Sequence, residues 1–208
     1  DLVLWIDPSD STTLVQTTPG VGNTVTSIAD KALDGGVSLA TPAGFYQGTA
    51  GNRPTRQTVN GLDMLLFDGN DDYMDFKVNN FVTNATLGDL SATGTYEIFI
   101  VFQSEQNTTG GNTSTDPFQN THIIGDSGGF YGTAIYGQNT ATPSIQAYVW
   151  NAGTKSTPAS PGDSFAHSAI HQVRFTNNNT TLKHSLNGGT ESTIAAAGPG
   201  GITSTLQL

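Results

Sequence analysis

Cysteine is absent from this chain of 208 residues, and basic residues are scarce. Without cysteine the protein can form neither a disulfide bond nor a thiolate metal site. Lysine and arginine together number 7 and are scattered singly, so there is no basic stripe to suit a nucleic acid or an anionic membrane. No apolar run approaches the roughly 20 residues of a transmembrane helix, and no signal peptide is recognisable. We therefore expect no nucleic-acid partner and no insertion into a membrane.

Residues that favour helices are also few. Glutamate occurs only at positions 97, 105 and 191, and charged residues make up 12% of the chain, whereas glycine numbers 25 and threonine and asparagine are abundant. This composition favours strands and turns over helices. A hydrophobic share of 35% still supplies a core, which argues against disorder. The chain is predicted to be all-β with almost no helix, and its net charge of −10 gives it an acidic surface.

The strand pattern predicts a β-sandwich. The segment "LDMLLFDGNDDYMDF" (62–76) reads as two strands around a turn, and "TYEIFIVFQ" (95–103) is apolar on both faces, as in a central strand covered on both sides. Residues 171–194 predict a three-stranded meander with a type I′ turn at Asn187-Gly188. At least ten short strands with regularly spaced turns indicate two antiparallel sheets, a jelly roll formed by residues 1–208 as a single domain.

Four segments occur in an order that resembles a known family. These are "LVLWIDPSDSTTL", "VTSIADKA", "NRPT" and "LLFDGNDDYMDF". They resemble LamG-like jelly-roll domains of the concanavalin A-like lectin/glucanase superfamily. The matching residues are Trp5, Asp7, Ser9, Asp10, Asp30, Arg53, Pro54 and Phe67 to Tyr73. The resemblance covers nearly the whole chain, and it implies the sandwich fold more specifically than any function.

The same resemblance implies that residues 1–208 are one piece of a longer chain. Domains of this kind continue past "ITSTLQL" with a strand that returns to the sandwich, and this chain stops at Leu208. We therefore expect an open sheet edge beside "LVLWI" or "YEIFIVF", filled in the native assembly by later residues or by another subunit.

The string "GDSGG" around Ser127 matches the segment that holds the nucleophile of trypsin-like proteases. Such a serine needs a histidine base and an acid to orient it. The only histidine before it is His122, and there is no cysteine for the usual flanking disulfides, although a triad using later histidines stays open. Glycine, serine and aspartate are common turn residues, so we interpret the string as a turn and expect Ser127 not to be a nucleophile.

A glycoside hydrolase of the retaining type needs two carboxylates about 5 Å apart. Glu97 and Glu105 are the only glutamates in one strand region, and their spacing along an extended strand separates them by more than roughly 20 Å. This pair cannot be a catalytic dyad, and the aspartates concentrate in predicted turns. We expect no enzymatic activity.

The turn "DGNDDYMD" carries Asp68, Asn70, Asp71 and Asp72, whose oxygens are ligands that Ca²⁺ prefers. The segment lacks the spacing of an EF-hand. One hypothesis is a calcium site formed by these four residues, and the other is an Asx-turn whose side chains bond only to the backbone.

Aromatic residues on glycine-rich loops are candidates for stacking on a ligand. We predict this role for Phe45, Tyr46 and Tyr131, and we predict that Trp5, Phe67 and Tyr73 belong to the core.

Two functions are compatible with these features. The first is a non-catalytic surface module of an extracellular assembly, such as a phage virion or a bacterial surface structure, acting in adhesion, glycan binding or decoration. Its partners would be other subunits of the assembly and glycans, and its location would be extracellular or on the virion surface. The alternative is a carbohydrate-active enzyme or its sugar-binding domain.

Overall fold

The computed structural model describes 11 segments of the chain. They are residues 4–32, 43–68, 71–85, 96–104, 121–126, 131–136, 143–151, 154–156, 164–178, 181–195 and 206–208. Regular structure in these segments consists of antiparallel strands and one short 3₁₀ helix, η1 (Ala50–Asn52). No helix in them has the length and apolarity needed to cross a membrane. The prediction of an all-β protein with almost no helix is confirmed.

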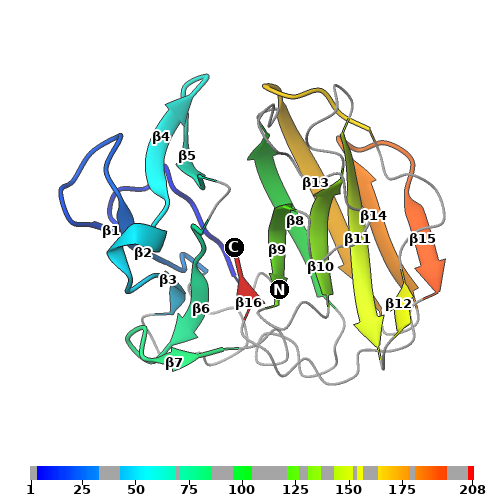
Figure 1. Cartoon of the computed structure of the whole chain (residues 1–208), viewed down its shortest axis with the longest axis horizontal. Coiled ribbons are helices and arrows are strands. Elements are labelled where there is room, and N and C mark those ends of the chain that lie inside the picture. The colour runs from blue at the N-terminus through cyan, green and yellow to red at the C-terminus, as the bar shows by residue number, and fades with distance from the viewer. Residues whose placement is uncertain are drawn as a thin grey trace. The chain divides into compact units, whose positions relative to one another are not determined.

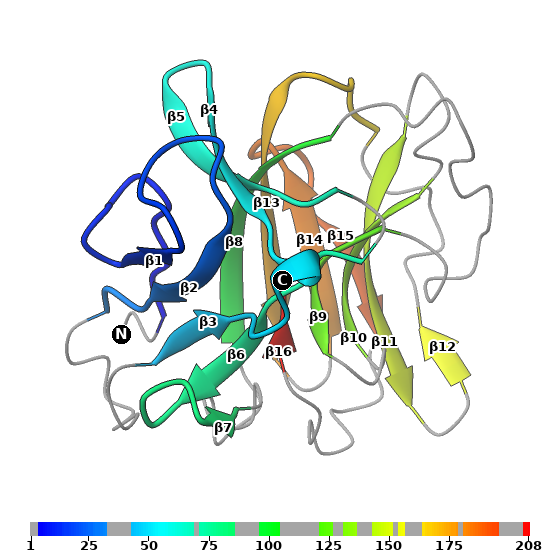
Figure 2. The same cartoon turned by 60° about the vertical axis from the view of Figure 1, so that its left-hand side comes forward.

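Two compact units make up the chain, the first formed by Asp1–Leu90 with Ser204–Leu208, and the second by Ser91–Thr203. The strands of the first unit are β1 (Leu14–Gln16), β2 (Val25–Ala29), β3 (Gly44–Tyr46), β4 (Thr55–Val59), β5 (Leu62–Leu66), β6 (Asp75–Val78), β7 (Thr83–Asn84) and β16 (Leu206–Gln207). They pair in the order β1-β2-β3-β6-β16, with β7 also on β6, while β4 and β5 form a separate hairpin. Figure 2 shows this hairpin in cyan.

The core of the first unit lies where β2, β3 and β6 meet. Phe45 on β3 pairs with Ile28 on one side and with Phe76 on the other, and all three side chains are fully buried. The rings of Phe45 and Phe76 meet edge to face with their centroids 5.3 Å apart. Met74 is also buried, and its backbone exchanges two hydrogen bonds with that of Leu208. The strands predicted on either side of the 62–76 turn are present as β5 and β6.

The second unit contains two sets of paired strands. Its strands are β8 (Tyr96–Gln103), β9 (Thr121–Asp126), β10 (Tyr131–Tyr136), β11 (Ser144–Asn151), β12 (Thr154–Ser156), β13 (Ile170–Asn177), β14 (Thr181–Leu186) and β15 (Ser192–Ala195). One set runs β9-β10-β11-β12 and the other β15-β14-β13-β8. Both sets contribute to one buried cluster that joins Ile145 of β11 to Phe102, Val173 and Leu186 of β8, β13 and β14.

The predicted meander is confirmed by β13, β14 and β15, which follow one another in Figure 1. Asn187 and Gly188 both have positive φ, 51° and 71°, as a type I′ turn requires. The Asn187 side chain accepts a hydrogen bond from the backbone N–H of Gln172 and also bonds to the ring of His171. These two bonds therefore hold the turn to β13, which lies outside the β14–β15 hairpin.

One strand prediction is wrong. Residues 95–103 were expected to form a central strand, but β8 lies at the edge of its sheet and pairs, among the described strands, only with β13. Its inward side chains reach the core, whereas Phe99 and Val101 are 59% and 55% exposed. Apolar residues on both faces of a strand therefore do not show how many other strands pair with it.

Candidate functional site

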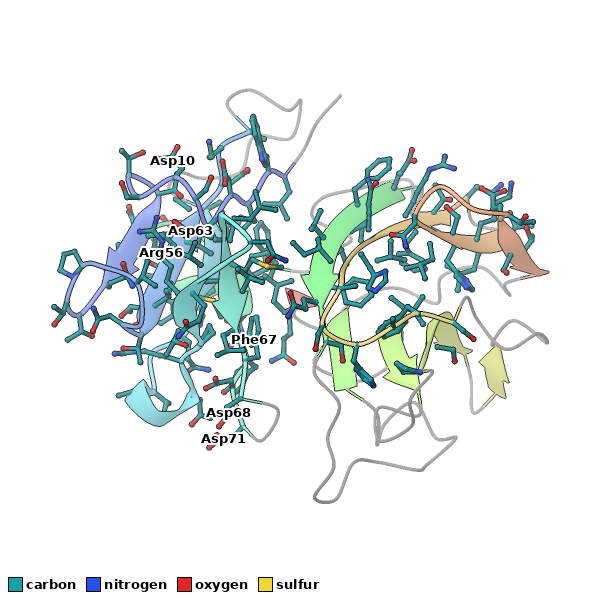
Figure 3. The ribbon with its side chains drawn as sticks, turned by 90° about the horizontal axis from the view of Figure 1, so that it is seen from above. Asp10, Arg56, Asp63, Phe67, Asp68 and Asp71 are labelled. Carbon is teal, nitrogen blue, oxygen red and sulfur yellow. The ribbon has the colours of Figure 1, made fainter. Side chains whose placement is uncertain are left out.

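The aspartates of the turn between β5 and β6 come together as predicted. Ligand oxygens of Asp68, Asp71 and Asp72 all lie within 4.8 Å of one another, and Asp68 and Asp71 are exposed while Asp72 is half-buried. Figure 3 shows Asp68 and Asp71 side by side in this turn. Asn70 lies outside the described residues, so its predicted part in the site stays a prediction.

Two hydrogen bonds hold this carboxylate cluster in place. The backbone N–H of Asp68 donates to Oδ2 of Asp72 at 3.0 Å, and the N–H of Asp71 donates to Oδ1 of Asp68 at 3.3 Å. The Asp68 side chain therefore bonds to the backbone of this turn as predicted, although its N–H partner is three residues on and not the two of an Asx-turn. This bond does not replace the metal hypothesis, because three carboxylates within this distance could bind a divalent cation such as Ca²⁺.

Electrostatics within the cluster favour partial neutralisation. Burial raises the pKa of Asp72, the charges of Asp68 and Asp71 raise it further, and only the N–H of Asp68 opposes this. A bound cation would relieve the repulsion between these carboxylates. Because the cluster is mostly exposed and small for a calcium site, we expect binding in the weak, millimolar range of extracellular modules.

We expect Asp72→Asn to raise the melting temperature near neutral pH without added metal, because the charged form of Asp72 is disfavoured in the folded protein. The pKa of Asp72 is raised in the folded protein, so its ionisation lowers the free energy of unfolding. This loss of stability is absent at low pH and appears as the pH rises through the folded-state pKa. The stabilising effect of Asp72→Asn should therefore vanish on acidification. Calcium should raise the melting temperature of the natural chain and raise that of the variant less.

Thermal denaturation across a pH series, with and without Ca²⁺, measures both effects. Glu191→Gln is the matched control, because it removes one negative charge from the second unit. Equal calcium shifts in the natural chain and in Asp72→Asn would contradict the metal hypothesis.

The structure describes the side chains of two of the three aromatic residues predicted to stack on a ligand, Phe45 and Tyr46. The prediction that Phe45 is exposed is wrong, since β3 lies between β2 and β6 and directs this side chain into the core, where it is 1% exposed. Tyr46 is half-buried, and its ring already stacks on Phe81 with Lys77 above it. The backbone of Tyr131 lies in β10, but its side chain is outside the described part of the structure. Ser127 and Glu105 lie outside it too, so the predictions that concern them stay predictions.

An exposed aromatic occurs instead at Trp5, which is 49% exposed and not part of the core as predicted. Its backbone is fixed by strong hydrogen bonds: its N–H donates to Oδ1 of Asp30 and its carbonyl accepts from the N–H of Lys31, both at 2.8 Å. The backbone that carries the indole is therefore fixed, while the side chain itself is half exposed. Phe67 and Tyr73 are half-buried.

Lys31 connects Trp5 to two aspartates. Its ammonium lies 4.6 Å from the centroid of the Trp5 ring, 2.9 Å from Oδ2 of Asp7 and 3.0 Å from Oδ2 of Asp10. We call Trp5, Asp7, Asp10, Asp30 and Lys31 the Trp5 cluster. Four of the five are residues that carry the family resemblance, so in the structure those scattered positions form one polar surface around an aromatic ring.

Three groups of the Trp5 cluster, Asp7, Asp10 and Lys31, have pKa values shifted toward their ionised forms, whereas burial raises the pKa of Asp30. The Ser9 hydroxyl and then Lys31 lower the pKa of Asp7, while the Thr12 hydroxyl and Lys31 lower the pKa of Asp10 to about 2. The two aspartates in turn raise the pKa of Lys31. The cluster therefore presents two carboxylates and one ammonium beside the indole at every physiological pH. Lys31 was missed by the sequence analysis, although its position directly after Asp30 was a usable signal.

The two glutamates that the structure describes are both neutralised by cations. Arg174 donates hydrogen bonds to Glu97 and to Glu191, and Lys183 also contacts Glu191 at 2.6 Å. The Lys183 hydrogen bond lowers the pKa of Glu191, the opposite of what a general acid needs. This arrangement suits a surface ion network and not a hydrolytic pair.

No protein-family model, curated protein or solved structure matches this chain.

Proposed function

We propose that this chain is a LamG-like jelly-roll β-sandwich that acts as a non-catalytic surface module of an extracellular assembly, such as a phage virion or a bacterial surface structure. Its role there is adhesion through the binding of glycans. The resemblance of the segments around Trp5, Asp30 and Phe67 supports the family, and the acidic composition, poor in charge and rich in threonine and glycine, supports an extracellular location.

The buried cluster of the second unit supports a sandwich. Phe102, Val173 and Leu186 come from the β8-β13-β14 sheet, and Ile145 comes from the β9–β12 set of strands. Side chains from two antiparallel sheets that meet in one core are the basis of sandwich architecture.

The single observation that carries glycan binding is the half-exposed indole of Trp5 beside charged, ionised groups. A sugar ring presents an apolar C–H face, which stacks on an aromatic surface, and a rim of hydroxyls, which need donors and acceptors. Lys31, whose ammonium lies over the indole, supplies a donor, and Asp7 and Asp10, which contact that ammonium, supply acceptors. The backbone of Trp5 is held by Asp30 and Lys31, so the main chain that carries the indole need not be ordered on binding, which lowers the cost of binding.

A glycan array followed by titration calorimetry on any hit tests the proposal. Trp5→Leu should abolish or weaken binding by about tenfold or more, which corresponds to about 1.4 kcal/mol or more. The fold should survive, since the hydrogen bonds at this position come from the backbone. Val82→Ala is the matched control because Val82 is 74% exposed and lies elsewhere in the first unit. Absence of any glycan hit, or equal binding by Trp5→Leu, would contradict the proposal.

One observation favours the alternative, a carbohydrate-active enzyme. Asp72 has a raised pKa and stands close to two other carboxylates, as the general acid of a glycosidase does. Against this, the same carboxylates bond to the backbone of their own turn. A hydrolysis assay on each array hit separates the two functions: turnover that Asp72→Asn abolishes would establish the enzyme and overturn the binding module.

A further inference from the structure

Two Asn-Gly pairs occur in this chain, and both lie in turns of the same kind. Asn60-Gly61 joins β4 to β5, and Asn187-Gly188 lies in the connection from β14 to β15. φ is 52° and 81° in the first pair and 51° and 71° in the second, so each has the backbone of a type I′ turn. All four residues are exposed. A difference in reactivity between the two turns therefore has to come from the contacts of their asparagine side chains.

The amide of Asn187 is held at both ends. Its Oδ1 accepts a hydrogen bond from the backbone N–H of Gln172 at 2.9 Å, and its Nδ2 lies 3.0 Å from Nδ1 of His171. Nε2 of His171 faces the carbonyl oxygen of Ala166 at 2.9 Å, so Nε2 carries the hydrogen and Nδ1 accepts from the amide. The Asn187 side chain therefore cannot turn without breaking two hydrogen bonds.

The amide of Asn60 has no such partners. In the part of the chain that the structure describes, no hydrogen bond reaches this side chain. The polar side chains before and after it in the hairpin, Thr58 and Asp63, bond to each other. The Asn60 amide can therefore rotate onto the backbone nitrogen of Gly61 without losing a contact.

We propose that Asn60-Gly61 is a site of spontaneous modification, at which asparagine is converted to isoaspartate and aspartate with loss of ammonia. The backbone nitrogen of Gly61 attacks Cγ of Asn60. The N–Cγ bond forms, the Cγ–Nδ2 bond breaks, and Nδ2 leaves as ammonia with the proton that the backbone nitrogen gives up. Glycine favours this attack, because it has no Cβ to crowd its nitrogen.

Water completes the reaction by opening the cyclic imide at one of its two carbonyl carbons. Opening at the side-chain carbonyl gives aspartate, and opening at the main-chain carbonyl gives isoaspartate. In both cases the nitrogen regains a proton and the new carboxyl group releases one to the solvent, so the step needs no oxidant or reductant. Each product adds one negative charge to a chain whose net charge is −10.

The two products differ in their effect on the β4–β5 hairpin. Asp-Gly is itself a preferred pair for a type I′ turn, so aspartate preserves the turn. Isoaspartate adds one methylene to the main chain between Val59 and Leu62, which pair with each other at the end of the hairpin, and it should separate them. The other end of the hairpin should persist, because the backbone of Arg56 bonds to Gly22 and Asn23.

Incubation of the folded full chain at mildly alkaline pH, followed by peptide mapping with mass spectrometry, measures both sites in one sample. Asn60 should lose ammonia about tenfold or more faster than Asn187, because two hydrogen bonds must break before the Asn187 amide can react. In the urea-unfolded chain the two rates should become similar, since each site is then an unstructured Asn-Gly pair. Equal rates in the folded protein, a faster reaction at Asn187, or a difference that persists in urea would overturn the proposal.

Two variants test the physical cause. His171→Phe removes the acceptor of the Asn187 amide and should raise the rate at Asn187, under conditions in which circular dichroism shows a folded protein. Asn60→Gly removes the reacting amide and keeps a pair that type I′ turns accept. After incubation the amides of Val59 and Leu62 should exchange hydrogen faster in the natural chain but not in Asn60→Gly. An unchanged rate in His171→Phe, or equal exchange in the two incubated chains, would contradict the proposal.

Discussion

Replacing Gly44 with alanine is expected to lower the free energy of unfolding by about 3 kcal/mol or more. Gly44 begins β3 with φ of +152°, a conformation that other residues rarely adopt. A Cβ at this position would lie 2.1 Å from the carbonyl oxygen of Ile28 and 2.8 Å from Cα of Ala29. Both atoms belong to the backbone of β2, so no side-chain rotation can relieve the clash, and the pairing of β2 with β3 must shift.

Urea denaturation followed by tryptophan fluorescence measures this loss, with Trp5 reporting from the first unit. Gly51→Ala is the matched control, because nothing lies within 4 Å of the Cβ it would add, and its stability should change by no more than about 0.5 kcal/mol. Equal midpoints for the two variants would show that β2 and β3 can separate at this point without cost.

Phe175→Ala should destabilise the second unit by about 3–5 kcal/mol. Phe175 is fully buried on β13, between Ile98 of β8 and His184 of β14. Removing its ring loses the transfer free energy of the side chain and leaves a cavity, because strands paired on both sides cannot collapse inward to fill it. The urea transition should move to markedly lower concentration.

Phe99→Ala is the matched control for this variant. It removes the same ring from the neighbouring strand, but from a side chain that is 59% exposed. It should cost less than about 1 kcal/mol. A loss as large as that of Phe175→Ala would mean that the exposed face of β8 is covered in solution.

Features that depend on neighbouring residues could be predicted from the sequence. The Asn187-Gly188 turn follows from the positive φ that only a few residues tolerate, and the meander follows from the short connections between its strands. The carboxylate cluster of Asp68, Asp71 and Asp72 was foreseeable for the same reason, because a tight turn keeps residues close in sequence close in space.

Features that depend on distant residues could not be predicted in this way. Phe45 lies on a glycine-rich segment that reads as a loop, and it is buried only because β2 and β6 flank it. Alternation along β8 shows which side chains share a face, but not whether a strand lies on each side of it. The Trp5 cluster joins residues 5–10 to residues 30–31 through Lys31.

The sequence by itself therefore determined the fold class, the meander with its Asn187-Gly188 turn and the acidic turn, because local backbone preference and side-chain periodicity act over a few residues. Only the tertiary structure decided that Phe45 is buried and that Trp5 is exposed beside charged groups. These properties depend on which strands pair. Strands that are distant in the sequence pair because they pack well together, and the residues around each strand do not show this.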